Sequence, residues 1–149
     1  MQQNFLRILR AFDACGRATL DLNALASHLA EPPAALRATV AQLVQEGFLR
    51  SADSPDEFRR TEAALLALAG PRDATLYTRR GCHLCDDAKA VILPLLREFG
   101  GTLREVDVDS DPALRDAYSN DVPVIFLGSR KVAKHRVDPR QFRRQLASS

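Results

Sequence analysis

The hydrophobic periodicity of this 149-residue chain changes at Gly70-Pro71. Upstream, apolar residues recur at helical spacing; downstream, short apolar runs alternate with helical segments. Gly followed by Pro ends a helix and begins an extended stretch, because Pro lacks the N–H group and restricts the preceding residue. The sequence therefore predicts two domains, residues 1–70 and residues 71–149. The first is small for an independent core, so we expect it to pack on the second or on another copy in a homodimer.

The composition is that of ordinary folded protein, with 46% apolar and 27% charged residues. It excludes disorder and low complexity. No apolar run approaches the roughly 18 residues of a membrane helix, so we expect no membrane partner. Charges interrupt every apolar stretch near the start, so no secretory signal is predicted and the expected location is cytoplasmic. The net charge of +2 is too small to indicate nucleic-acid binding.

Residues 1–70 predict three helices, a β-hairpin and a fourth helix. The apolar stripes of the three helices are Phe5/Ile8/Leu9/Phe12, Leu22/Leu25/Leu29 and Leu36/Val40/Leu43/Val44. The first helix is expected to end at Gly16 and the third at Gly47. Asp21 or Asn23 is expected to cap the second helix, and Pro32-Pro33 to open the third. Strands are predicted at 48–50 and 58–60, with the last helix at 61–69.

This order, carried by LALASHLAEPPAALRATVAQLVQEGFL and FRRTEAALLALAG, resembles a winged helix-turn-helix domain. The resemblance implies that the helix opened by Pro33 would enter the DNA major groove. Its predicted solvent face carries one positive charge, Arg37, and the hairpin loop SADSPDE has a net charge of −3. Because DNA affinity comes mainly from Lys and Arg on phosphates, DNA is a disfavoured partner. A protein-contact or dimerisation module is the alternative.

Residues 71–149 predict the order β-α-β-α-β-β-α, which is the thioredoxin fold. The predicted strands are 74–78, 103–108, 122–127 and 131–135, and the helices run from Cys82 to about Phe99, 112–119 and 141–147. Asp111-Pro112 and Asp138-Pro139 each place a capping residue before a Pro-favoured first helical position. Pro94 is expected to kink the first helix.

The sequence RRGCHLC places two cysteines, Cys82 and Cys85, where a strand turns into a helix. At a helix N-terminus, N–H groups and the helix dipole stabilise a thiolate. We therefore predict that Cys82 is the nucleophile and that Cys85 is a more buried resolving thiol. Arg79 and Arg80 are expected to lower the pKa of Cys82 further, and His83, when protonated, to tune the thiolate.

The strings LYTRRGCHLCDDAK, REVDVDSDPALRDAY and DVPVIFLGSRKVAKHR are similar to bacterial glutaredoxin-like proteins over residues 73–147. The resemblance implies a redox-active cysteine pair and a cis-proline, Pro123, with Val122 offering backbone groups to an extended substrate. It implies that Arg79 lies near the thiolate and glutathione. Apart from the resemblance, Arg80, His83 and Leu84, which lie beside and between the cysteines, are also predicted to bind substrate.

The family pattern is not complete here. The dipeptide between the cysteines is His83-Leu84, Asp121 replaces a usual Thr, and Lys131 to His135 replaces the Gly-Gly of the last hairpin. Glutathione and a protein thiol are therefore alternative reductants.

Zinc would need four ligands, and no second CxxC or close His pair supplies them, so no metal is predicted. An iron–sulfur cluster bridging two copies through Cys82 is the remaining alternative cofactor. The third cysteine, Cys15, is interpreted as a small buried apolar residue. The basic residues from Arg130 to Arg144 are interpreted as a solvated face that could attract an acidic partner.

The leading hypothesis is a thiol–disulfide oxidoreductase that acts on protein or small-molecule disulfides, is recharged by an unknown reductant, needs no bound cofactor and carries a winged-helix interaction module. The alternative hypothesis is a redox-responsive regulator, in which the state of Cys82 and Cys85 alters how that module binds DNA or protein.

Overall fold

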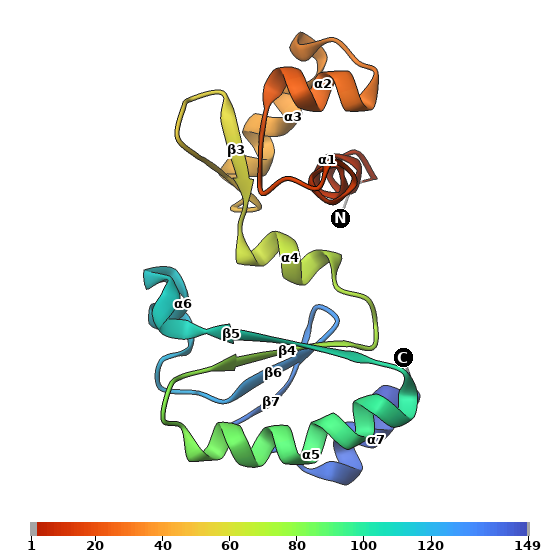
Figure 1. The fold of residues 1–149 in the computed structure, drawn as a ribbon, viewed down its shortest axis with the longest axis vertical. Helices are drawn as coiled ribbons and strands as arrows, with labels where there is room; N and C mark the ends of the chain where they lie inside the picture. Colours follow the sequence, from red (N-terminus) through yellow and green to blue (C-terminus); the bar gives the residue numbers. More distant parts are fainter. Residues whose placement is uncertain (1–2, 149) are drawn as a thin grey trace. The chain divides into compact units, whose positions relative to one another are not determined.

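The computed structural model describes residues 3–148, which divide into two compact units that meet at Leu68–Ala69. The boundary predicted from the sequence lies at Gly70-Pro71. Figure 1 shows helices and a small sheet in unit 1, and a larger sheet flanked by helices in unit 2. Each unit has its own apolar core.

Unit 1 combines helices with a small antiparallel sheet. Its elements are α1 (Gln3–Cys15), β1 (Thr19–Asp21), α2 (Leu22–Leu29), α3 (Pro33–Gln45), β2 (Leu49–Ser51), β3 (Glu57–Arg60) and α4 (Glu62–Leu68). The sheet has the order β1-β3-β2. Asp21 caps α2 as predicted, because its carboxylate accepts the Ala24 N–H at 2.6 Å. The predicted apolar stripes of α1 and α2 form the core together with Leu36, Val40 and Leu43 of α3.

One prediction for unit 1 was wrong, and one strand was missed. Val44 was assigned to the buried face of α3, but it is 36% exposed. Adjacent helical residues are about 100° apart, so Val44 lies beyond the edge of the face that contains Leu43. Strand β1 was not predicted, because its pairing partner lies far along the chain and no neighbouring turn indicates it. This strand exists through its pairing with β3, in which Leu20 lies opposite Phe58.

Unit 2 contains a four-stranded mixed sheet. Its elements are β4 (Asp73–Thr78), α5 (His83–Phe99), β5 (Thr102–Asp107), the 3-10 helix η1 (Val108–Ser110), α6 (Pro112–Tyr118), β6 (Val124–Leu127), β7 (Arg130–Lys134) and α7 (Pro139–Ala147). The strand order is β5-β4-β6-β7, with β4 and β5 parallel and the other pairs antiparallel. Apart from η1, this is the predicted β-α-β-α-β-β-α order, so unit 2 has a thioredoxin-like fold. The turn η1 was not predicted.

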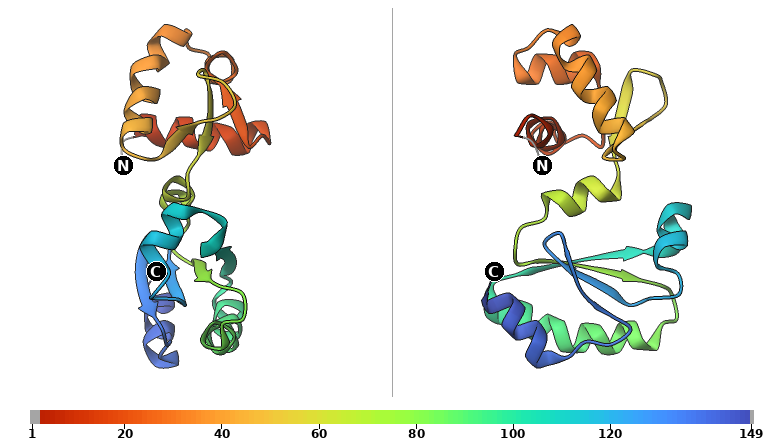
Figure 2. Two further views of the ribbon diagram at one scale, coloured as in Figure 1. Left: turned by 90° about the vertical axis from the view of Figure 1, so that its left-hand side faces the viewer. Right: turned by 180° about the vertical axis from the view of Figure 1, so that it is seen from behind.

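The sheet of unit 2 has an apolar core on each face. Figures 1 and 2 show α5 and α7 together on one face, where Leu76, Ile125, Ile92 and Phe142 are buried. Tyr77 and Val124, which point to the other face, pack with Leu114 of α6. The central strands are therefore held from both sides.

Local signals set most element boundaries of unit 2. Asp111 and Asp138 cap α6 and α7 as predicted, since each carboxylate accepts a backbone N–H at 2.9 Å. Helix α5 runs through Pro94. Strand β6 begins at Val124 rather than at the predicted Val122, because Pro123 has no N–H to donate to a neighbouring strand.

Candidate functional site

The Cys82–Cys85 segment lies where β4 leads into α5, at the end of the strand. Residues 79–82 separate the two elements, and Gly81 among them has a φ of +76°, in the left-handed region that favours glycine. The N–H of Cys82 donates to the Arg79 carbonyl at 3.3 Å. This turn places Cys82 at the N-cap of a 17-residue helix.

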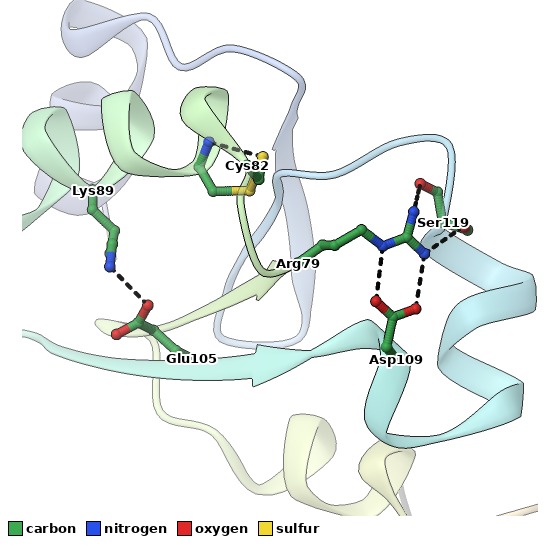
Figure 3. Close-up of a disulfide and its surroundings, with 7 residues drawn as sticks. Arg79, Cys82, Lys89, Glu105, Asp109 and Ser119 are labelled. Atoms are coloured by element: carbon green, nitrogen blue, oxygen red, sulfur yellow. Dashed lines mark hydrogen bonds and ion pairs between the residues drawn. A yellow bond between two sulfur atoms is a disulfide. The ribbon is translucent and has the colours of Figure 1, made fainter.

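The two cysteines form a disulfide. Their Cα atoms are 5.3 Å apart, within the usual range for a bridged pair. The Cys85 N–H also donates to the Cys82 Sγ at 3.1 Å (Figure 3). A Cys82 thiolate would keep this donor and would also lie at the positive end of the α5 dipole.

The two sulfur-bearing residues differ in burial. Cys82 is half-buried, whereas Cys85 is only 2% exposed. Cys82 is therefore the more accessible of the two residues. This asymmetry is the one that the sequence analysis expected for a nucleophile and a resolving thiol.

The dipeptide between the cysteines faces solvent. His83 is exposed, and Leu84 is 38% exposed, which is unusual among the large apolar side chains of residues 3–148. Arg80 is exposed as well. These three predicted site residues therefore surround the cysteines with one apolar and two polar surface groups.

Arg79 does not extend toward the sulfur atoms. Its Nε and Nη2 donate to the two carboxylate oxygens of Asp109 at 3.0 Å each, and Nη2 donates to the Ser119 hydroxyl at 2.7 Å. Figure 3 shows the side chain directed to these partners and away from Cys82. The predicted cation beside the thiolate is thus paired with a carboxylate on a neighbouring segment.

Asp109 interacts with a second cation. The Arg115 Nε lies 3.4 Å from its carboxylate, and Arg115 also donates to the Asp109 carbonyl at 3.2 Å. The hydrogen bonds from Arg79, followed by the charges of Arg79 and Arg115, hold the pKa of Asp109 below its usual value. Asp109 is therefore ionised at neutral pH.

Sequence reasoning did not select Asp109 or Ser119. The parallel register pairs Thr78 with Asp107, so the residues that follow β4 and β5 emerge at the same sheet edge. This register exists only in the folded chain, so local sequence did not indicate Asp109. An ion pair between Lys89 and Glu105, at 3.1 Å, links α5 to β5 near the disulfide and was also not predicted.

The Val122–Pro123 peptide bond is cis, as the glutaredoxin resemblance implies. Pro123 is buried and Val122 is half-buried. The Pro123 carbonyl accepts the His135 N–H at 2.8 Å, and the His135 ring lies 3.8 Å from the Asp121 carboxylate. The segment before β6 is thus tied to the residue that follows β7.

Two other kinds of site are absent from residues 3–148. No group of three or more His, Cys, Asp or Glu side chains is arranged to hold a metal ion. No helix in this part of the chain combines the length and apolar character needed to cross a membrane. Cys15, interpreted above as a buried apolar residue, is half-buried against the core of unit 1.

Comparisons with known proteins concern the C-terminal part of the chain. A glutaredoxin-like protein of Dictyostelium discoideum is 38% identical over 68 residues, which are 42% of this chain and 63% of that relative. An uncharacterized protein of Mycobacterium tuberculosis is 30% identical over 79 residues, or 50% of this chain and 81% of its own. The X-ray structure of a structural genomics target from X. campestris aligns at 34% identity with a TM-score of 0.44, covering 51% of this chain and 97% of that one. The profile of the Glutaredoxin-like domain (DUF836) matches residues 73–147, and the chain belongs to this family.

Proposed function

We propose that this protein is a thiol–disulfide oxidoreductase, with Cys82 as the nucleophile and Cys85 as the resolving thiol. The observation that carries the proposal is the disulfide at the start of α5, in which Cys82 is half-buried and Cys85 is 2% exposed. This arrangement suits a reaction that begins on one sulfur and ends on the other.

In the reduced protein, the Cys82 thiolate attacks one sulfur of a substrate disulfide. A mixed disulfide forms between Cys82 and that sulfur, and the other substrate sulfur leaves as a thiolate. Cys85, as a thiolate, then attacks the Cys82 sulfur, which closes the Cys82–Cys85 disulfide and releases the second substrate thiolate. Two electrons pass to the substrate, and an external dithiol or two monothiols return them.

The groups around the cysteines support substrate binding. Leu84 offers an exposed apolar contact, and His83 and Arg80 offer exposed polar contacts. The backbone of Val122, beside the cis Pro123, is proposed to pair with an extended substrate segment. A protein disulfide, with apolar and backbone groups on both sides, fits this surface.

Unit 1 is proposed to be a winged-helix interaction module. Its three helices and the β2–β3 hairpin support this reading. The exposed residues of α3 include Ala34, Ala35, Arg37, Ala38, Ala41 and Gln42. A face with one cation and a hairpin loop containing Asp53 and Asp56 favours a protein partner over DNA. Absence of salt-sensitive duplex binding in a gel-shift scan of reduced and oxidised protein is the expected result.

The test of the proposed reaction is reduction of insulin disulfides by the full chain with dithiothreitol as reductant. Cys82→Ser should abolish the activity, because the attacking sulfur is lost. Cys85→Ser should accumulate a mixed disulfide that mass spectrometry detects. Turnover of Cys85→Ser should also fall strongly, because dithiothreitol must then resolve the mixed disulfide in place of Cys85. Even an effective concentration of only about 1 M for the intramolecular thiol is about a thousandfold above that of millimolar dithiothreitol.

Cys15→Ser is the matched control, since it removes the third cysteine outside the site. Its activity should stay within about twofold of the unsubstituted protein. Full activity in Cys82→Ser would show that the mechanism is wrong.

A further inference from the structure

We propose that Asp109 is a specificity-determining residue: by occupying the Arg79 guanidinium, it disfavours small anionic thiols and disulfides and directs the site toward protein disulfides. This inference rests on the proposed function and names its substrate class. It concerns Arg79 because a guanidinium so close in sequence to Cys82 is the natural ligand for a substrate carboxylate.

Most of the hydrogen-bonding capacity of the Arg79 guanidinium is already used within the protein. Nε and Nη2 form the two parallel bonds to Asp109, which is the geometry that a substrate carboxylate would itself adopt. The remaining contacts go to Ser119, with Nη2 to its hydroxyl at 2.7 Å and Nη1 to its carbonyl at 3.5 Å. Asp109 is therefore an internal substitute for an anionic ligand.

The backbone of Arg79 adjoins the disulfide, and its ion pair with Asp109 is open to competition. The Arg79 carbonyl accepts the Cys82 N–H, so the residue is fixed next to the disulfide. The side chains of Arg79 and Asp109 are 34% and 43% exposed, so a ligand in solution could reach them. Arg115, also bonded to Asp109, holds the carboxylate in place.

The strength of such a pair sets the size of the effect. A carboxylate ligand must displace Asp109 before it can bind Arg79, and a pair of this exposure weakens that ligand about two- to fivefold. A protein substrate that relies on Leu84 and on backbone contacts incurs no such competition. The 38% exposure of Leu84 next to both cysteines is the complementary observation.

The test is binding of an unreactive anionic probe, S-methylglutathione, and of its dimethyl ester to the full chain, measured by NMR titration. Asp109→Asn should bind the diacid about two- to fivefold more tightly than the unsubstituted protein and should leave ester binding unchanged. Adding Arg79→Gln to Asp109→Asn should remove the gain, which separates Arg79 from Arg115. Ser119→Ala, which removes one acceptor of Arg79, should show a smaller gain in the same direction.

Asp116→Asn is the matched control, because it removes an equal charge from an exposed position on α6. It should bind both probes as the unsubstituted protein does. The inference is overturned if neither Asp109→Asn nor Ser119→Ala gains affinity for the diacid, if the ester gains equally, or if the gain persists without Arg79. Insulin reduction by the unsubstituted protein, measured in parallel, separates the two proposals. Absence of that activity contradicts the proposed function, whereas the binding result decides the role of Asp109.

Discussion

Two glycines with nearly the same φ flank helix α5, and this allows a matched test of how the redox segment is positioned. Gly81 has a φ of +76° and Gly100 a φ of +73°, and a Cβ added at either would meet nothing within 4 Å. The cost of Gly→Ala at each position is therefore conformational and not steric.

The expected magnitude is the same at both ends. An L-residue in the left-handed region costs roughly 1–2 kcal/mol. Alanine also reduces the conformational entropy of the unfolded chain, which offsets about 0.4–1 kcal/mol of that cost. We expect a net loss of about 1 kcal/mol in the free energy of unfolding for Gly81→Ala and for Gly100→Ala alike.

Tyrosine fluorescence during urea denaturation measures this loss in unit 2 alone. The chain has 2 Tyr and no Trp, and Tyr77 and Tyr118 both belong to the core of unit 2. The transition midpoint should move to lower urea in both variants with an unchanged slope.

Only Gly81 should affect the chemistry. It precedes Cys82 directly, whereas Gly100 follows the far end of α5. Insulin reduction should therefore slow in Gly81→Ala and remain unchanged in Gly100→Ala. The reasoning is refuted if Gly81→Ala loses less than about 0.3 kcal/mol, or if Gly100→Ala slows turnover as much as Gly81→Ala does.

Three further predictions test the cores and the charge network. In unit 1, Arg60→Met should lower the free energy of unfolding by about 2 kcal/mol, because Arg60 bonds to Asp13 and to the Leu9 carbonyl and lies over the Phe12 ring. Circular dichroism measures this loss in the unfolding transition that tyrosine emission does not report. The control Arg59→Met, at the exposed preceding position, should cost less than about 0.5 kcal/mol. In unit 2, Ile92→Ala should cost about 3 kcal/mol by tyrosine-monitored denaturation, since Ile92 is 0% exposed in the core below the sheet; a cost below about 1 kcal/mol would contradict that packing. Because Arg79 holds the pKa of Asp109 below its usual 3.8, the contribution of Asp109 to stability is present above that pH and is lost as the pH falls through the lowered pKa. The difference in urea midpoint between the unsubstituted protein and Asp109→Asn should therefore vanish in acid. A difference that grows in acid would contradict this direction of the pKa shift.

Local signals predicted much of the fold. The caps at Asp21, Asp111 and Asp138 act within three residues of themselves, so neighbouring sequence is sufficient to specify them. The sequence did not reveal β1, because its three residues are defined by pairing with β3, about forty residues along the chain.

The sequence by itself predicted where the cysteine pair lies and how its two members differ: a CxxC after a strand starts a helix on a thiol and gives the two cysteines unequal burial. Tertiary structure decided what the charges around that thiol do. Arg79 was expected beside the sulfur, but Asp109, brought to the same edge by the parallel register of β4 and β5, binds it instead. The physical reason is the separation along the chain over which each interaction acts. Backbone capping acts between neighbours in the chain, whereas the partner of a long, flexible cation is chosen among all groups that folding brings within its reach.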